Sequence, residues 1–372
     1  MTDVLLHLCS PPEWRAALEA GVVAPPSLTD VGFVHLSTAD QVALPAERLF
    51  AGRRDMVLLA VDPGRLERAG IEVRWEPGVP GDPESMRFPH AYGAIPATAV
   101  LGVLPYRPDD DGRFSAPEVP PLDDAGRGRL LQPSILRRTA TREVGIAGGV
   151  AVLTDSVPSS MLHNQLLVGP GVDTATLVAE ADRVLGGAGL THAAAYVLAP
   201  APGDADALRA DGWRIEDLVT MCAPVADLPD ATGTELVETV DLDELRPLFD
   251  ASWRERVPGI TDDQAAHLTD RYRIEDAVVA LHCYAVREGD RVVATCLLKR
   301  DGGTAWLDAV ETVPDARRRG HANALIRAAA ATARDAGCDL VALDTWADDW
   351  KRAWYARLGF TDAGHALAAV RD

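Results

Sequence analysis

The sequence predicts an α/β (α+β) protein in which two tandem, related mixed sheets flanked by helices follow a small α/β domain. The first observation is length, because 372 residues exceed the size at which one hydrophobic core usually stops growing. The second is the alternation of short apolar runs, typical of buried strands, with stretches whose apolar residues recur at helical spacing. The third is an internal repeat in the later part of the chain.

Composition divides the chain into four segments. Residues 1–106 form the first domain, and residues 107–134 form a linker that is rich in proline and acidic side chains and poor in large apolar ones. Residues 135–230 and 235–372 form two further domains, with a stretch of Asp, Pro and Gly near 226–234 between them. We therefore predict three folded domains.

The second and third domains repeat one order of elements. In the second domain, a helix over 174–185 is followed by a strand over 193–198 and then by a Gly-Trp pair. In the third, a helix over 322–334 is followed by a strand over 340–343 and then by a Gly-Phe pair. The agreement predicts two copies of one fold.

The third domain shows further elements before and after its repeat. Helices are expected around 242–254 and 261–274, followed by strands over 282–287, 291–299 and 304–313 with glycine-containing turns between them. A last helix is expected after residue 344, with Asp348 as a possible N-cap.

Charge and composition exclude several classes of function. Asp and Glu outnumber Lys and Arg by 56 to 36, so a general nucleic-acid surface or an anionic-membrane surface is disfavoured. The chain has neither a signal-like N-terminus nor an apolar run near the roughly 18 residues of a membrane span, so we expect a cytoplasmic protein. We expect buried free thiols and no metal site, because the cysteines are odd in number and include no Cys-x-x-Cys pair: Cys9, Cys222, Cys283, Cys296 and Cys338.

A basic loop joins the strand over 304–313 to the helix over 322–334. Its sequence is Arg317-Arg-Arg-Gly-His-Ala322. The start of a helix has unpaired N–H groups and the positive end of the helix dipole, and glycine lets an anion approach the backbone. The loop therefore predicts a phosphate site, while a solvated basic turn is the alternative that these residues alone leave open.

A second motif follows this loop downstream, where a helix ends in Tyr355-Ala-Arg-Leu-Gly-Phe360. An Arg-x-x-Gly-x-Ala loop followed at this separation by Tyr-x-x-x-Gly-Phe resembles the GNAT acetyltransferase family. The resemblance implies that residues 235–372 bind acetyl-CoA as a co-substrate, with the thioester between two diverging parallel strands. It also implies transfer of the acetyl group to an amine, which is a small molecule or a peptide.

The resemblance implies which residues contact CoA. Backbone amides near Val313 would hold the pantetheine arm, and the amides of residues 318–323 would bind the pyrophosphate. The expected contacts are Val313, Arg317, Arg318, Arg319, Gly320, His321, Ala322 and Asn323.

Three residues are candidates for catalysis. Tyr355 matches the family tyrosine that protonates the departing thiolate, a role suited to a phenol with a normal pKa of about 10. For the base that deprotonates the amine we favour Asp308 over Glu311, which the period of a strand places on the opposite face. The alternative is that either carboxylate only completes a polar network or faces solvent.

Three tryptophans lie close to Tyr355 in the sequence. Trp346, Trp350 and Trp354 recur every four residues, which predicts one stripe along a helix. Such a stripe usually packs in the core, so we expect core packing rather than an aromatic pocket for the acceptor.

The second domain lacks both motifs of the third. The stretch 163–173, which precedes its helix, carries no arginine-bearing loop, and no tyrosine stands four residues before Gly212. We expect a degenerate copy that is structural or contributes to a substrate cleft; a second acyl-CoA site is the alternative.

The first domain has a different set of polar residues. Histidines stand among aromatic, serine and glycine residues in Gly32-Phe-Val-His-Leu-Ser-Thr38 and Phe88-Pro-His-Ala-Tyr-Gly93. With His7 and Trp75-Glu76, these segments resemble the DUF952 family, whose fold is related to that of ADP-ribosyltransferases. The resemblance covers residues 1–105 and implies no established activity.

A polar site in this domain is a hypothesis from the residues themselves. His35 and Ser37 could hydrogen-bond a ribose or a nicotinamide amide, with Glu76 or His90 in the same cleft, which makes NAD a possible ligand. His7 completes the candidate set. The alternative for His35, which lies between apolar neighbours, is a core residue with its hydrogen bonds satisfied.

These patterns lead to one functional hypothesis and two alternatives. We expect an acyl-CoA-dependent N-acyltransferase that transfers acetyl by direct attack of the amine, since Cys283 and Cys296 have no adjacent histidine to activate them. The alternatives are a protein that senses CoA or a nucleotide without turnover, and an NAD- or ADP-ribose-handling activity of the first domain. The sequence leaves the oligomeric state and the acceptor open.

Overall fold

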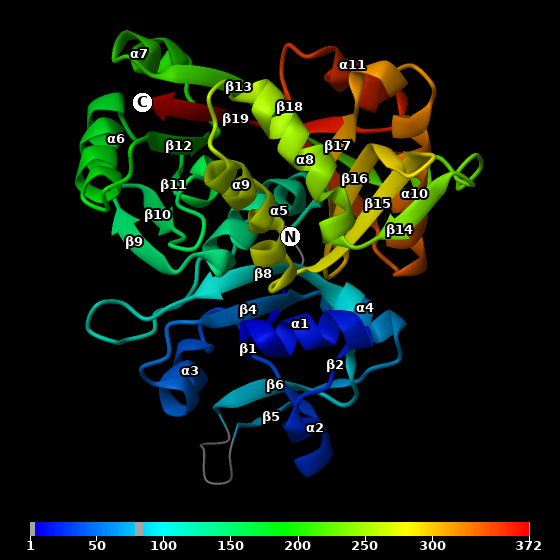
Figure 1. The fold of residues 1–372 in the computed structure, drawn as a ribbon. Coiled ribbons are helices and arrows are strands. Elements are labelled where there is room, and N and C mark those ends of the chain that lie inside the picture. The colour runs from blue at the N-terminus through cyan, green and yellow to red at the C-terminus, as the bar shows by residue number, and fades with distance from the viewer. Residues whose placement is uncertain (1–3, 79–84, 372) are drawn as a thin grey trace.

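The computed structural model describes residues 4–78 and 85–371, and a small N-terminal domain lies below a larger one (Figure 1). The main sheet of the small domain has the order β1 (Leu5–Cys9), β4 (Met56–Val61), β8 (Val100–Tyr106). Two smaller sheets pair β2 (Val22–Val23) with β7 (Ile95–Pro96), and β3 (Val34–His35) with β6 (Arg87–Ala91) and β5 (Val73–Pro77). The helices are α1 (Pro11–Ala20), α2 (Pro26–Asp30), α3 (Ala43–Phe50) and α4 (Pro63–Arg68).

Helix α1 shows how local sequence sets the limits of an element. Ser10 and Glu13 form a capping box at its start, Pro11 occupies its first position, and Gly21 ends it with a φ of 75°. The left-handed conformation at that end is one that glycine adopts without strain. The helix turns Trp14 into the core, where its side chain is fully buried.

The larger domain is one sheet of 11 strands in the order β14-β15-β16-β17-β18-β13-β19-β12-β11-β10-β9. The strands of the first copy are β9 (Arg142–Ile146), β10 (Gly149–Leu153), β11 (Gln165–Val168), β12 (Ala193–Leu198) and β13 (Arg214–Pro224). Those of the second are β14 (Val237–Val240), β15 (Ala280–Glu288), β16 (Arg291–Asp301), β17 (Thr304–Thr312), β18 (Leu340–Trp346) and β19 (Thr361–Arg371).

The sheet contains two copies that exchange their last strands. Each copy has one parallel pair, β11 with β12 and β17 with β18, and all other pairs are antiparallel. The last strand of the first copy, β13, pairs with β18, and the last strand of the second, β19, pairs with β12. Because β13 and β19 also pair with each other, the two copies form one continuous sheet. The predicted fold class is confirmed, although the two predicted sheets are joined.

Helices cover both faces of this sheet. In the second copy, α10 (His321–Asp335) and α11 (Trp350–Arg357) contribute to the core on one face. The opposite face is covered by α5 (Asp124–Thr139), α8 (Leu242–Arg256) and α9 (Asp262–Asp276). The first copy adds α6 (Thr174–Ala181), which continues as a π-helical turn, and α7 (Asp204–Ala210). Within the described residues, no helix combines the length and apolar composition needed to cross a membrane.

Two expectations about elements are wrong. The predicted linker over 107–134 includes the first part of α5, where Arg127 and Leu131 are buried against the large sheet. Its glycines concealed this helix, because Gly128 allows α5 to approach β13 so closely that a Cβ would lie 2.2 Å from Cys222 Sγ. The cap of α11 is Asp349 rather than Asp348.

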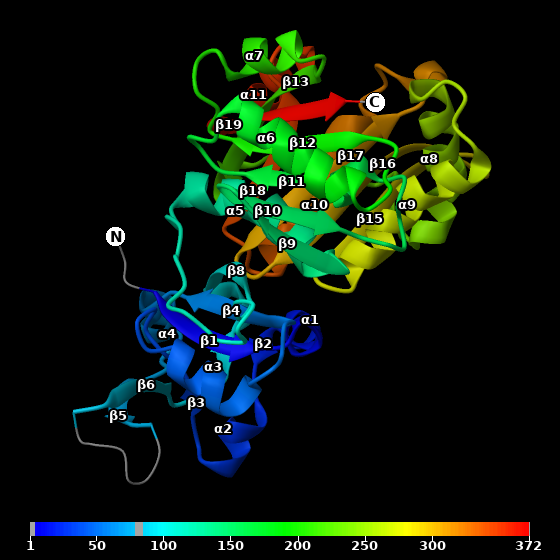
Figure 2. The ribbon, with the colours of Figure 1, turned by 90° about the vertical axis from the view of Figure 1, so that its left-hand side faces the viewer.

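The N-terminal domain is docked onto the large sheet by polar contacts, in the arrangement visible in Figure 2. Trp14 donates its indole N–H to Asp301 at 2.7 Å, and Asp301 forms a buried ion pair with Arg138 of α5. Arg65 of α4 also lies 2.5 Å from Asp339. The five cysteines lie buried with free thiols, as predicted.

Candidate functional site

The main cleft lies where two parallel strands separate. The pairing of β17 with β18 ends at Trp306↔Ala342. A cleft of about 1120 Å³ lies at this opening, lined by both strands, α8, α9, α11 and the start of α10. Asp308 and Asp344 each stand two residues beyond the last pair, and both line the cleft.

A bulge in β17 changes which way its carboxylates point. Leu297 of β16 stands opposite Asp308, and Thr295 stands opposite Glu311, so β17 has one extra residue between them. Ala309 adopts a φ of 49° at this position. Residues directly opposite one another share a face, so Asp308 and Glu311 share one. The expectation that they lie on opposite faces is wrong, because simple alternation ignores the extra residue.

Asp308 belongs to a buried chain of charges. Lys299, whose side chain is fully buried, lies 2.6 Å from Asp308 and 2.6 Å from Glu275, and Glu275 lies 3.4 Å from His163 of the first copy. Burial alone would raise the pKa of Asp308, but Lys299 and Arg271 lower it. Burial likewise opposes ionisation of Glu275, yet Lys299 helps to lower its pKa to about 2. Asp308 therefore stays ionised and is a weak base.

Asp344 has the opposite electrostatic environment. Its carboxylate accepts hydrogen bonds from Thr220 Oγ1 at 2.7 Å and from the Tyr196 hydroxyl at 3.0 Å. Burial, reinforced by the nearby charge of Asp308, raises the pKa of Asp344 in spite of these hydrogen bonds. A carboxylate with a raised pKa accepts a proton more readily, so Asp344 is the better base of the two.

Asp344 was not among the predicted catalytic residues. In the sequence it simply ends a buried strand, as aspartates often do. The signal that could have found it is spacing: Asp308 is the fifth residue of β17 and Asp344 is the fifth of β18. Equivalent positions on adjacent parallel strands place both side chains at the same opening.

Tyr355 lies at the cleft with its side chain largely buried. Its ring contacts Trp354 and Phe360, with centroid distances of 4.8 Å and 5.7 Å. Burial raises the pKa of Tyr355 above that of a free phenol. The hydroxyl therefore keeps its proton at neutral pH and is available to donate it.

Glu311 points toward α8. It accepts a hydrogen bond from Ser252 Oγ at 2.7 Å and forms an ion pair with Arg256. These contacts hold its charge at the α8 end of the cleft, so Glu311 is placed to shape the cleft rather than to remove a proton.

The start of α10 has the geometry of an anion site. Gly320 is its N-cap with a φ of 87°, and no side chain of the described residues caps the helix there. Arg317 and Arg318 line the cleft beside it. Arg319 instead forms an ion pair with Glu288, which reduces the charge that it could offer a phosphate. The free N–H groups, the helix dipole and two arginines remain for an anion.

Val313 does not offer the backbone groups that the sequence suggested. Its N–H donates to Val293 O at 2.9 Å, and its carbonyl accepts from the N–H of Ala316 at 3.0 Å. The residue lines the cleft with its side chain, as does Ala322 in the first turn of α10. The amide of Val313 is therefore not available to a ligand in this structure.

The other two loop residues hold neighbouring groups. Asn323 Oδ1 accepts a hydrogen bond from Trp354 Nε1 at 2.9 Å, which fixes the indole at the cleft wall. His321 Nε2 lies 3.7 Å from Glu288, and its side chain is mostly buried. Both residues line the cleft.

Of the three tryptophans in the predicted stripe, Trp354 packs against a core cluster. Trp346 is the last residue of β18, whereas Trp350 and Trp354 belong to α11, so the three do not share a helix. Trp346 is 46% exposed and Trp350 is 69% exposed, and all three line the cleft. The prediction of core packing is wrong for Trp346 and Trp350, because the strand ends before the helix begins.

Comparisons with known proteins agree with this geometry. Residues 242–360 match the model of the acetyltransferase (GNAT) family, and residues 8–103 match that of DUF952, a protein family of unknown function. The chain joins a DUF952 domain to a GNAT domain. No curated protein matches it.

Solved structures similar to the chain differ in what they cover. A functionally unknown conserved protein from Staphylococcus epidermidis shares the fold at 14% identity, with a TM-score of 0.51 over 62% of this chain and 93% of its own. A GCN5-related N-acetyltransferase from Kribbella flavida is 20% identical, with a TM-score of 0.47 over 66% of this chain and 95% of its own. A Caulobacter crescentus protein is 31% identical over 30% of this chain and 93% of its own, with a TM-score of 0.26.

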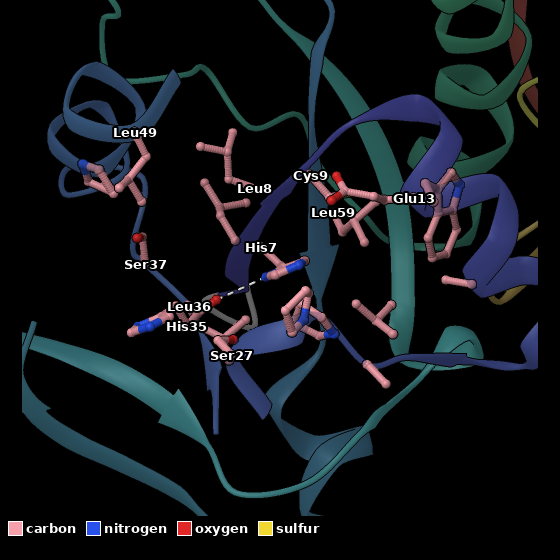
Figure 3. Close-up of a pocket in the computed structure, with 18 of the residues that line it drawn as sticks. His7, Leu8, Cys9, Glu13, Ser27, His35, Leu36, Ser37, Leu49 and Leu59 are labelled. Carbon is pink, nitrogen blue, oxygen red and sulfur yellow. Dashed lines mark hydrogen bonds between the residues drawn. The ribbon is translucent and has the colours of Figure 1, made fainter. Parts of the chain in front are cut away.

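The DUF952 domain has a pocket of its own, of about 680 Å³ (Figure 3). Three predicted residues line it: His7, His35 and Ser37. His35 is an exposed side chain, so its interpretation as a core residue is wrong. His7 is buried, and its Nδ1 lies 2.9 Å from the backbone oxygen of His35.

The other two predicted residues form a separate cluster beside this pocket. His90 Nδ1 lies 3.3 Å from Glu76, which also accepts a hydrogen bond from the Tyr92 hydroxyl at 2.8 Å. The His90 ring stacks on Phe33 at 4.0 Å and meets His35 edge-on at 5.1 Å. Neither Glu76 nor His90 is among the described residues that line the pocket. NAD binding stays an untested prediction, and Arg48 is the only lysine or arginine in that lining.

Proposed function

We propose that the GNAT domain transfers an acyl group, most simply acetyl, from acetyl-CoA to an amine. The observation that carries this proposal is the convergence, at one strand opening, of an anion site at α10, a basic carboxylate and a protonated phenol. The first suits the pyrophosphate of CoA, and the others are the base and the acid that the reaction needs.

The proposed reaction is one direct displacement. Asp344 takes a proton from the attacking amine, and the nitrogen lone pair forms a bond to the thioester carbonyl carbon. The C–S bond then breaks, and the departing thiolate takes the proton of the Tyr355 hydroxyl. The amide product and CoA leave, and proton exchange with water restores Asp344 and Tyr355.

The cleft walls support an amine as the acceptor. Asp308 and Glu311 are held in ion pairs, whereas the hydrogen bonds that Asp344 accepts come from hydroxyl groups, so Asp344 brings its charge to the lining. Trp253, Trp346 and Trp350 bring aromatic faces. Carboxylates attract a protonated amine electrostatically, and indole faces bind cations and apolar groups. We therefore expect acceptors with an apolar body next to the amino group.

Release of the CoA thiol tests the proposal. Purified protein with acetyl-CoA and a panel of aromatic and aliphatic primary amines is expected to release CoA thiol in an amine-dependent way, measured with a chromogenic disulfide. The matched tertiary amines are the control, because their acylation cannot give a neutral amide. Tight binding of acetyl-CoA without turnover on any primary amine would support a sensor and contradict an enzyme.

Gly320→Glu is expected to weaken acetyl-CoA binding about 10- to 30-fold, measured by calorimetry. The substitution puts a negative charge at the positive end of the α10 dipole and forces a side chain into a left-handed backbone conformation. Gly320→Gln is the matched control, because it introduces the same strain without the charge. Equal loss in both variants would mean that the backbone, and not the anion field, accounts for the effect.

Tyr355→Phe is expected to lower kcat about tenfold with little change in acetyl-CoA affinity. The thiolate of CoA is a fair leaving group, because thiols have pKa values of about 8.5, so loss of the proton donor is less severe than loss of a base. Single-turnover measurements at saturating acetyl-CoA report the effect. An unchanged kcat would assign protonation of the thiolate to water.

A further inference from the structure

The pocket of the DUF952 domain is independent of the proposed acyl transfer, and its lining is mostly apolar. It lies between α1, α2, α3 and the main sheet, and its size falls within the range of small-molecule sites, roughly 300–1,000 Å³. Leucine, valine, alanine, proline and phenylalanine side chains supply most of the lining. The few polar groups in it therefore decide which ligand head group fits.

His7 is a hydrogen-bond acceptor in this lining. Its side chain is 6% exposed, and Nδ1 lies 2.9 Å from the backbone oxygen of His35, which can only accept a hydrogen bond. The proton of a neutral ring must therefore be on Nδ1, and Nε2 carries a lone pair. Burial lowers the pKa of His7 and so favours the neutral ring. Among residues 4–78 and 85–371, no group hydrogen-bonds Nε2, which lies at the opposite edge of the ring (Figure 3).

Glu13, an exposed residue, adds a negative charge to the same lining. Its Oε2 accepts hydrogen bonds from the N–H and the hydroxyl of Ser10, both at 2.7 Å, in the capping box of α1. Burial would raise the pKa of Glu13, but the hydrogen bonds from Ser10, with a smaller contribution from the charge of Arg53, lower it, so the group is ionised. No cation of the described residues forms an ion pair with it, and Oε1 is left without a hydrogen-bond partner there.

We propose that this pocket binds a small apolar amine, whose ammonium group donates hydrogen bonds to His7 Nε2 and Glu13 Oε1 while its alkyl or aryl body fills the apolar lining. A protonated amine matches a buried neutral acceptor and, in the same lining, a carboxylate that forms no ion pair with the described residues. A carboxylic acid would meet only Arg48 there, which already has another interaction partner. A neutral alcohol would satisfy His7 but could not form an ion pair with Glu13.

Octylamine, 1-octanol and octanoate test the ligand class without acetyl-CoA, so the result does not depend on acyl transfer. Calorimetry on the full chain is expected to show octylamine binding at least tenfold more tightly than octanol, and no octanoate binding. Equal binding of octylamine and octanoate overturns the proposal. So does the absence of octylamine binding at about 1 mM, a dissociation constant that corresponds to a binding free energy of about −4 kcal/mol.

Variants locate the bound amine. Glu13→Gln, which keeps an acceptor for Ser10, and His7→Asn, which keeps a donor toward His35 O, are each expected to weaken octylamine binding about tenfold. Glu19→Gln removes a charge from the same helix outside the pocket and is expected to have no effect. Far-UV circular dichroism checks that each variant is folded. If His7→Asn does not fold, the binding result for Glu13→Gln alone tests the proposal. Loss of binding in Asp344→Asn, with binding kept in Glu13→Gln, would place the amine in the GNAT cleft and overturn the proposal.

Discussion

Asp344→Asn is expected to lower kcat for acetyl transfer about 10²- to 10⁴-fold, the usual contribution of a positioned general base. Asparagine has nearly the same size and can still accept a hydrogen bond from Thr220 or Tyr196, so the strand ends should keep their positions. What the variant loses is the ability to take a proton from the amine. Steady-state kinetics with saturating acetyl-CoA measure the loss, and calorimetry should show acetyl-CoA affinity within about twofold of the wild type.

The pH dependence gives this assignment a second readout. A general base works only when it is ionised, so the wild-type rate should fall as the pH drops through the pKa of Asp344, which burial raises. Asp344→Asn should remove that acidic limb from kcat. The high-pH limb, which requires Tyr355 to keep its proton, should stay in both proteins, because burial raises the pKa of the phenol.

Asp308→Asn is the matched comparison at the equivalent position of β17. Asp308 forms an ion pair with Lys299, so this variant is expected to reduce stability more than kcat. If Asp308→Asn abolished turnover while Asp344→Asn kept it, the base would be Asp308. The sequence favoured Asp308 for its place before the arginine loop, whereas the charge of Lys299 argues against it.

The difference between the two aspartates shows what sequence patterns can supply. The loop with Gly320 and the motif at Tyr355 are local, and each places its own residues at the start or end of a helix. The role of Asp344 depends on Tyr196 and Thr220, which come from the other copy of the fold. Partners more than 100 residues away leave no local signature, so the sequence could point to the candidate anion loop and to Tyr355 but not to Asp344.

The same distinction separates the parts of the fold. Periodicity placed α8, α9, α10 and the strands β12 and β15 to β18 within a few residues, because each buries a face of its own. It did not reveal the exchange of β13 and β19, which depends on pairing between residues about 150 positions apart, such as Leu218↔Ala366. Periodicity did not reveal the bulge either. Ala309 adopts a left-handed conformation there, which a glycine at this position would have suggested but an alanine does not.

Strand exchange has a consequence for the candidate site. Leu218 of β13 lines the cleft, and Thr220 of the same strand holds Asp344, so the first copy completes the site of the second. This supports the expectation that the degenerate copy contributes to a substrate cleft. The first copy also supplies His163, which lies next to Glu275 in the buried chain of charges that ends at Asp308. Removal of the first copy would therefore expose Glu275 and Lys299 together.

Asp301→Ala is expected to destabilise the protein by about 3–5 kcal/mol, the usual effect of removing one partner of a buried ion pair. Asp301 and Arg138 are each about 1% exposed, and Arg138 Nη2 lies 2.5 Å from the carboxylate. Without Asp301, the guanidinium keeps its hydrogen bond to Val278 O but has lost its countercharge in the interior. Trp14 loses its acceptor in the same step, which weakens the contact of the DUF952 domain with the sheet. Urea unfolding followed by tryptophan fluorescence measures the change.

Two control variants separate the contributions. Asp301→Asn keeps an acceptor for Trp14 and removes only the charge, so it should destabilise less than alanine. Asp55→Ala removes a carboxylate from the exposed pair with Arg53, which is 42% exposed, and is expected to cost about 0.2–1 kcal/mol. If Asp301→Ala were as mild as Asp55→Ala, water would have to reach Arg138. The DUF952 domain would then be held by its other ion pairs with the larger domain, Arg65 with Asp339 and Arg15 with Asp276, rather than by the buried pair.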